Sequence, residues 1–181
     1  AVDDYFGGAE GRRAGRVRFV GDARTRIEED ALRLLRFFRF QARYGRVPPE
    51  PALLATISGC LGMIDRLSAE RIWSELRRIL AGPALIPTLA LMGRAGMLAA
   101  CLPALSGRET AALSLLRCLP AEETGDPLLR LAALMAGAGL DPASVETTLT
   151  RLRVSRVEDR PVRAYLEPLP RSPASPSLAS D

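Results

Sequence analysis

The stretch Arg26–Arg43 reads RIEEDALRLLRFFRFQAR and combines aliphatic and aromatic residues with a dense set of arginines. Its apolar residues recur at spacings of three and four, which predicts a helix from Glu28 to about Tyr44. Gly45 and Pro48 follow the last apolar position and end the pattern. This amphipathic helix indicates a mainly α-helical fold.

The rest of the chain reads as a series of helices. Apolar spacing predicts a helix over Leu53–Ile64, weakened by Gly59 and Gly62. Further helix starts are predicted by capping residues, and the last of these helices is expected to break at Pro161. The predicted caps are Ser68, the pairs Asp126-Pro127 and Asp141-Pro142, and the capping box Ser155 with Glu158.

The two ends of the chain read differently from its middle. Arg16–Val20 alternates polar and apolar residues and predicts a short β-strand before a turn. Residues 168–181 are rich in proline and serine with little to bury, so we expect a disordered tail. The expected fold is therefore a short β segment followed by a multi-helix array.

Composition excludes several classes of function. The chain has 181 residues and no histidine, so Ser-His and Cys-His nucleophile pairs and histidine-containing metal sites are excluded. Its 3 cysteines form no CxxC pair, which suits a reducing cytoplasm. No apolar run is long enough to span a membrane, and we expect no membrane partner.

The basic charge is concentrated near the start of the chain. Residues 1–46 hold 11 arginines against 7 acidic residues, whereas the remainder is balanced. All the basic residues are arginines, which reflects a compositional bias, so their clustering is more informative than their number. The cluster favours an anionic partner such as a nucleotide or RNA.

Two acids and an arginine in the predicted helix suggest a base-reading site. Glu29 and Asp30 precede Arg33 by four and three residues, which would place all three on one helical face. A structural alternative is a simple intrahelical ion pair. Chemically, a carboxylate accepts hydrogen bonds and a guanidinium donates them. Side by side they match adenine and cytosine, which show an amine beside a ring nitrogen, and mismatch guanine and uracil.

Three more arginines continue along the same helix. Arg36, Arg39 and Arg43 could line an RNA backbone path, although a solvated face is an equally good interpretation. The phenylalanines between them, Phe37 and Phe38 and also Phe40, fit a hydrophobic core better than base stacking.

These residues carry a resemblance to a known family. The segment RVRFVGDARTRIEEDALRLLRFFRFQARYG resembles the bacterial (class II) tRNA nucleotidyltransferase and poly(A) polymerase family, which includes the CCA-adding enzymes. SAERIWSEL, at 68–76, is similar to a second segment of that family.

The resemblance implies an architecture of head, neck, body and tail. Residues 1–27 would be the end of the head and a linking segment, 28–82 the neck helices that bind nucleotide and RNA, 83–167 the helical body, and 168–181 the tail. Glu29, Asp30 and Arg33 would be the nucleotide-binding residues, with Glu29 positioning Arg33. The linking segment would contain Arg18, Gly21 and Asp22.

Two departures from the family pattern matter. The sequence contains no Asp-x-Asp pair, so the Mg²⁺ site expected in the head of this family cannot be built from it. Gly11-Arg12 stands where the family usually has Asp-Leu. The resemblance thus implies an RNA nucleotidyltransferase that uses ATP and CTP on RNA, above all the tRNA 3′ end, with this chain inactive alone. The alternative is a non-catalytic helical fragment that binds RNA or nucleotide.

Overall fold

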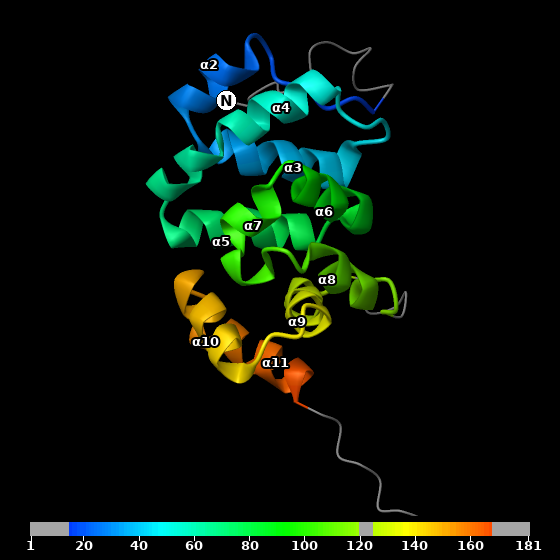
Figure 1. The fold of residues 1–181 in the computed structure, drawn as a ribbon, viewed down its shortest axis with the longest axis vertical. Helices are drawn as coiled ribbons and strands as arrows, with labels where there is room; N and C mark the ends of the chain where they lie inside the picture. The colour runs from blue at the N-terminus through cyan, green and yellow to red at the C-terminus, as the bar shows by residue number, and fades with distance from the viewer. Residues whose placement is uncertain (1–14, 120–124, 168–181) are drawn as a thin grey trace, which may run out of the picture.

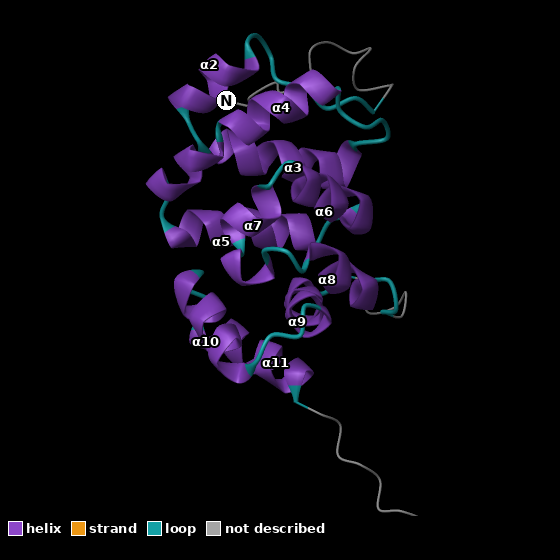
Figure 2. Cartoon of the chain, in the orientation of Figure 1, coloured by secondary structure: helices purple, strands orange, loops and turns teal. Residues whose placement is uncertain are grey.

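A computed structural model describes residues 15–119 and 125–167, and within these ranges the regular structure is helical (Figure 2). The helices near the start are α2 (Ala23–Glu29), α3 (Leu32–Tyr44), α4 (Pro51–Gly59), the 3₁₀ helix η1 (Leu61–Arg66) and α5 (Ala69–Leu80). Those that follow are α6 (Leu85–Arg94), α7 (Met97–Cys101), the 3₁₀ helix η2 (Pro103–Leu105), α8 (Glu109–Leu116), α9 (Pro127–Gly137), α10 (Pro142–Arg151) and α11 (Arg156–Leu166).

The helices are stacked along one long axis in roughly the order of the sequence (Figure 1). Helices α2, α3 and α4 form one end, α5, α6 and α7 the middle, and α10 and α11 the other end. The main packing contacts are α3 on α5, α8 on α9, and α9 on α11. The predicted mainly helical fold is confirmed.

The predicted β-strand at Arg16–Val20 is wrong, because the described residues contain no strand. The predicted alternation is nevertheless present, with Val17 and Phe19 buried and Arg16 exposed. A strand requires a ladder of hydrogen bonds to a second strand. Within the described part of the chain no such partner exists, so this segment is extended without being part of a sheet.

Two predicted helices are each divided in the structure. The helix predicted from Glu28 to Tyr44 is interrupted at Asp30, which adopts an extended conformation with φ −151° and ψ 104°. The helix predicted over Leu53–Ile64 ends at Gly59 and continues as the 3₁₀ helix η1. In each case a residue with low helix propensity marks the division.

The predicted caps are confirmed. The side chains of Ser68, Asp126, Asp141 and Ser155 each accept a hydrogen bond from a backbone N–H in the first turn of the helix that follows.

The predicted break at Pro161 is wrong, since α11 continues through it to Leu166. Proline deprives the carbonyl four residues earlier of its helical donor. That residue, Val157, is 85% exposed, so its carbonyl lies where water can replace the lost donor. Packing of α11 on α9 favours the continuous helix.

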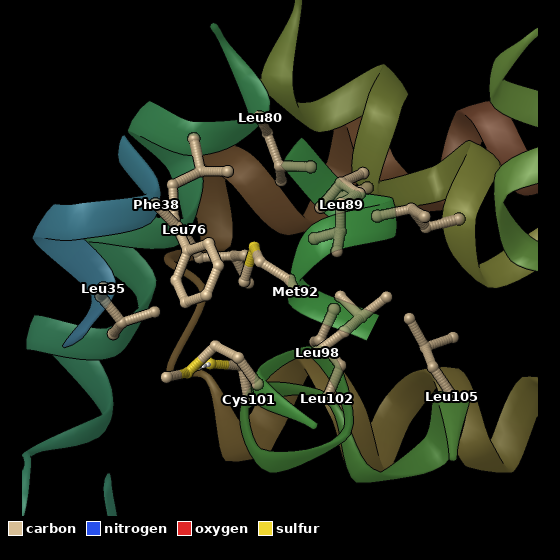
Figure 3. Packing of buried hydrophobic residues seen from close by; sticks show 14 of the residues in the cluster. Leu35, Phe38, Leu76, Leu80, Leu89, Met92, Leu98, Cys101, Leu102 and Leu105 are labelled. Carbon is tan, nitrogen blue, oxygen red and sulfur yellow. Dashed lines mark hydrogen bonds between the residues drawn. The ribbon is translucent and has the colours of Figure 1, made fainter. Parts of the chain in front are cut away.

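One hydrophobic core runs through the stack. In Figure 3, Leu35 and Phe38 of α3 face Leu76 and Leu80 of α5, with Met92 of α6 beside them. Phe37 and Phe38 are buried, which confirms the predicted core position of these aromatics.

The close approach of α3 and α5 depends on a glycine. A Cβ added at Gly82 would lie 2.7 Å from the Cβ of Ala42, too close for any larger residue without movement. The turn after α5 is also fixed by Arg130 of α9, a buried side chain. Its Nη1 donates to the carbonyl oxygens of Leu80 and Gly82.

Some predictions concern residues outside the described ranges, namely the disordered tail at 168–181 and the Gly11-Arg12 departure. Cys60, Cys101 and Cys118 are free thiols, and burial raises the pKa of the Cys101 thiol to about 12. None of the described helices combines the length and apolar character needed to cross a membrane.

Candidate functional site

The junction between α2 and α3 holds the predicted nucleotide-binding residues. Oε2 of Glu29, at the end of α2, lies 2.5 Å from Nη1 of both Arg26 and Arg33. Nη1 of Arg33 also donates to the carbonyl oxygen of Arg26 at 2.7 Å. The hydrogen bond from Arg33, with the nearby charge of Arg26, holds the pKa of Glu29 below its ordinary value of 4.5. Glu29 is therefore ionised at neutral pH and fixes the Arg33 side chain, which is 13% exposed.

Asp30 occupies a different position from the one predicted. It lies in the break between the two helices rather than on the face of one continuous helix. Its Oδ1 accepts from the backbone N–H of Leu32 at 3.1 Å and lies 3.4 Å from Nη2 of Arg71 on α5. The first of these bonds satisfies a free donor of the opening turn of α3. Within the described part of the chain, the contacts of Asp30 run through Oδ1, so Oδ2 can accept from a ligand.

The break changes how the three residues are brought together. Glu29 and Arg33 form the predicted ion pair across the junction, although they belong to different helices. Asp30 lies between them in sequence, with its side chain 29% exposed. The arrangement holds a fixed donor group and a partly exposed acceptor at one junction.

The residues predicted to form the linking segment lead directly into α2. Gly21 has φ +81°, a conformation that glycine adopts without strain. Asp22 then caps α2 by accepting from the backbone N–H and the hydroxyl of Thr25, at 2.8 and 2.7 Å. The backbone hydrogen bond is the main cause that lowers the pKa of Asp22. Arg18 lies on the exposed side of the extended segment.

Two of the predicted RNA-binding arginines contact a buried carboxylate of α5. Glu75 is only 3% exposed, and Nη1 of Arg39 lies 3.1 Å from both of its carboxylate oxygens. Arg36 Nε lies 3.8 Å and Arg78 Nη1 3.3 Å from Oε1 of the same residue. Arg36 and Arg39 are thus part of an ion cluster between α3 and α5, and neither is simply a solvated side chain.

The third arginine lies beside an aromatic pair at the end of α3. The guanidinium carbon of Arg43 is 5.7 Å from the ring centre of Tyr44, and that of Arg39 is 4.8 Å from the ring centre of Phe40. The two rings are stacked, with centres 6.2 Å apart. Arg43 itself is exposed.

A second acid, partly buried and treated in the sequence only as a cap, connects α5 to the C-terminal helices. Oε2 of Glu158 accepts from the indole N–H of Trp73 at 3.1 Å, and Oε1 from Arg77 at 2.8 Å. The same carboxylate completes the capping box with Ser155. Glu158 therefore fixes α11 against α5, far from it in sequence.

Glu75 was not predicted, although the sequence contains a signal for it. It lies between Ile72 and Ile79 at spacings of three and four, on the apolar stripe of its helix. A charged residue on such a stripe is buried, and a buried carboxylate needs a cationic partner. Glu158 gave no comparable signal, because its partners come from a distant helix.

The described residues do not fit a metal ion. Across 15–119 and 125–167, no three His, Cys, Asp or Glu side chains gather in a group that could bind one. No catalytic step through Mg²⁺ can be derived from this part of the chain.

Comparison with known proteins gives matches in both sequence and fold. Residues 48–107 match a family model described as "Probable RNA and SrmB- binding site of polymerase A". The human mitochondrial CCA tRNA nucleotidyltransferase 1 is 46% identical over 85 residues, covering 44% of this chain and 19% of the human protein. The CCA-adding enzyme of Geobacillus stearothermophilus is 35% identical over 115 residues, covering 60% of this chain and 28% of that enzyme.

The fold is shared with solved structures. The Thermotoga maritima CCA-adding enzyme complexed with tRNA superposes with a TM-score of 0.63 at 19% identity, over 88% of this chain and 40% of that one. A CCA-adding enzyme in complex with ATP gives a TM-score of 0.60 at 18% identity, over 88% of this chain and 39% of that one. The chain spans less than a third of the two sequence relatives and about two fifths of these structures. In its family-model match, its sequence relatives and its fold, this chain is similar to the helical body region of the CCA-adding enzyme and poly(A) polymerase family.

Proposed function

We propose that this chain provides nucleotide-base recognition and RNA binding in a nucleotidyltransferase that adds CMP or AMP to RNA 3′ ends. ATP and CTP would be the nucleotide substrates, and the tRNA 3′ end the RNA substrate. The proposal rests on the relatives and on one observation above all, the presence at one helix junction of a fixed Arg33 guanidinium and a partly exposed Asp30 carboxylate.

The chemistry of that pair matches two of the four bases. Oδ2 of Asp30 would accept from the exocyclic amine of adenine or cytosine, and Arg33 would donate to the adjacent ring nitrogen. Guanine and uracil present a carbonyl oxygen beside an N–H, so the same pair would set acceptor against acceptor and donor against donor. Glu29 would act by holding Arg33, through the 2.5 Å contact between them.

The RNA strand would follow α3 away from this junction. Arg36, Arg39 and Arg43 follow Arg33 at helical spacing, and cationic side chains along one face suit a phosphate backbone. Two of them are anchored on Glu75, which fixes the direction of their guanidinium groups. Arg18, Gly21 and Asp22 would link the nucleotide site to a catalytic head.

The division of the chain follows from the same family likeness. Residues 28–82 would form the neck that binds nucleotide and RNA, 83–167 the body, and 1–27 the link to the head. Mg²⁺ would be held in the head, because the described residues offer no site for it. The free thiols suit a reducing compartment, and we place the protein in the cytoplasm.

The test measures incorporation of each of the four nucleotides into RNA by the complete enzyme that, under this proposal, carries this chain. Asp30→Ala should remove the acceptor for the amine, and Arg33→Ala the donor to the ring nitrogen. A hydrogen bond to a charged group contributes about 1.5–3 kcal/mol. Preference for A and C over G and U should therefore fall roughly ten- to a hundredfold in each variant.

The matched control is Glu28→Ala, which removes an exposed carboxylate of α2, two residues before Asp30, that pairs with Arg24 at 3.5 Å. This variant should keep the preference. Unchanged preference in both test variants, with normal folding, would mean that Asp30 and Arg33 only stabilise the helix junction.

A non-catalytic binding function is the second candidate, favoured by the lack of a metal site within the described residues. Incubating this chain alone with Mg²⁺, labelled ATP and tRNA lacking its terminus does not separate the two candidates. Tight RNA binding without incorporation is expected under both. Loss of base preference in the complete enzyme carrying Asp30→Ala is expected only under the first.

A further inference from the structure

We propose that the pocket between the ends of α3 and α5 binds one unpaired nucleotide of the RNA, with its base stacked on Tyr44. This inference rests on the proposed RNA-binding function and extends it to a defined subsite. The pocket is lined by Arg39, Phe40, Arg43, Tyr44, Arg78, Ala81 and Gly82.

The aromatic wall of the pocket suits a base. Tyr44 is 49% exposed, and its ring is supported by the stacked ring of Phe40 and by the guanidinium of Arg43. A supported ring keeps one orientation, so a base can stack on it at little cost in side-chain entropy. Stacking on aromatic side chains is a common way for proteins to bind single-stranded RNA.

The charges around the pocket suit a phosphate. Arg39, Arg43 and Arg78 line it, and among the described residues no acidic side chain does. Within the described part of the chain, Glu75 is the acid that contacts Arg39 and Arg78, and one carboxylate offsets one of these charges. The pocket is therefore cationic.

The helix ends that meet at the pocket would by themselves repel an anion, because carbonyl groups are exposed there. At the end of α5 this effect is offset by Arg130. Its buried guanidinium donates to the carbonyl oxygens of Leu80 and Gly82, directly beside the pocket. A further positive charge thus lies next to Gly82, one of the residues that line the pocket.

The pocket is aligned with the nucleotide site. Tyr44 lies eleven residues after Arg33, which in an α-helix is three turns plus about 20° of rotation and roughly 16 Å of rise. Phe40, seven residues after Arg33, falls about 20° to the other side of the same line. An RNA strand whose end lies at Arg33 would therefore reach the pocket along one face of α3.

An RNA nucleotide fits this pocket better than an acidic peptide does. An acidic peptide would use the three arginines but not the ring of Tyr44, which is 49% exposed. A nucleotide uses both, since it carries a flat base and a phosphate together.

The experiment measures binding of this chain to an RNA hairpin with a short single-stranded 3′ end and to the same hairpin with a blunt end. The wild-type chain should prefer the single-stranded end. Tyr44→Ala should weaken binding to that RNA roughly five- to a hundredfold and leave the blunt hairpin unaffected. Tyr44→Phe keeps the ring and should bind like the wild type.

Arginine variants test the phosphate contact separately. Arg43→Gln should lower the slope of log affinity against log salt by about 0.7, the value for one phosphate contact on a single strand. Arg160→Gln is the matched control, because it removes the same charge from an exposed position on α11. It should leave the slope and the preference for the single-stranded end unchanged.

Three outcomes would overturn the proposal. The first is that Tyr44→Ala keeps the full preference for the single-stranded end. The second is that Tyr44→Phe loses as much affinity for this RNA as Tyr44→Ala does. The third is that poly-glutamate competes with the RNA for the wild-type chain but not for Tyr44→Ala. In the first case the wild-type chain still binds RNA, so only the pocket assignment fails. If the wild-type chain binds neither hairpin, the proposed RNA-binding function fails with it.

Discussion

Replacing Glu75 with glutamine should lower the free energy of unfolding, because this carboxylate pairs with three arginines. The carboxylate is 3% exposed and lies within 3.8 Å of Arg36, Arg39 and Arg78. Removing one partner of a fully buried ion pair costs about 3–5 kcal/mol, because the other charge is left uncompensated. Here the three arginines remain partly exposed to water, which lowers the cost. We expect a loss of about 2 kcal/mol, which for a protein of this size lowers Tm by roughly 4–8 °C.

The assay is urea and thermal unfolding followed by the helical circular dichroism signal. The matched control is Glu70→Gln, the same substitution on the same helix. Glu70 is 54% exposed, and its partner Arg153 at 2.6 Å is exposed as well. Exposed pairs contribute about 0–1 kcal/mol, and salt screens them. Glu75→Gln should therefore cost clearly more than the control, and added salt should narrow the gap little.

Equal losses in the two variants would refute the argument. They would mean that the buried carboxylate is no better paired than a surface one, and that Arg36 and Arg39 do not depend on it.

Two further substitutions test other parts of the structure. Arg130→Met should lower the free energy of unfolding by about 1–3 kcal/mol, because it leaves the carbonyl oxygens of Leu80 and Gly82 without their donor. Urea unfolding measures this loss. The backbone N–H of Ser144 is the main cause that lowers the pKa of Asp141 from its ordinary value of 3.8. The ionised carboxylate therefore stabilises the fold above pH 3.8, and this stabilisation is lost as the pH falls through the lowered pKa. Unfolding of Asp141→Asn should accordingly depend less on pH in this acidic range than unfolding of the wild type, and an identical pH dependence would contradict the assignment.

The sequence predicted the helical fold well where the signals are local. Asp126, Asp141 and Ser155 cap their helices as expected, since a cap depends on a residue and the N–H groups two or three positions later. Apolar spacing likewise identified the buried face of α3, including Phe38.

The failures concern features that depend on distant parts of the chain. Arg16–Val20 has the alternation of a strand, but a strand also needs a partner that a local pattern does not reveal. Pro161 has low helix propensity, but the packing of α11 on α9 outweighs it.

Asp30 shows the limit most clearly for the candidate site. Helical spacing predicted that it shares a face with Arg33, because the apolar pattern continues across it without interruption. Aspartate also competes for backbone N–H groups, and here it accepts from Leu32 and lies 3.4 Å from Arg71 of α5. The Glu29–Arg33 pair survives the break, since it spans the junction that Asp30 creates.

The charge of the arginine cluster also has to be reassessed in three dimensions. Counted along the sequence, residues 1–46 carry the whole basic excess, but Glu75 of α5 pairs with two of their arginines. If RNA binding depended on net charge alone, Glu75→Gln would strengthen it, because the variant is more positive. If it depends on arginines held in fixed directions, the same variant should bind RNA more weakly, because each released side chain must be ordered again on binding.

The structure favours weaker binding, since Arg39 and Arg78 line the pocket at Tyr44 while both are held by the same carboxylate. Binding measured at one salt concentration, with Glu70→Gln as the charge-matched control, separates the two; stronger binding by Glu75→Gln would leave net charge as the explanation.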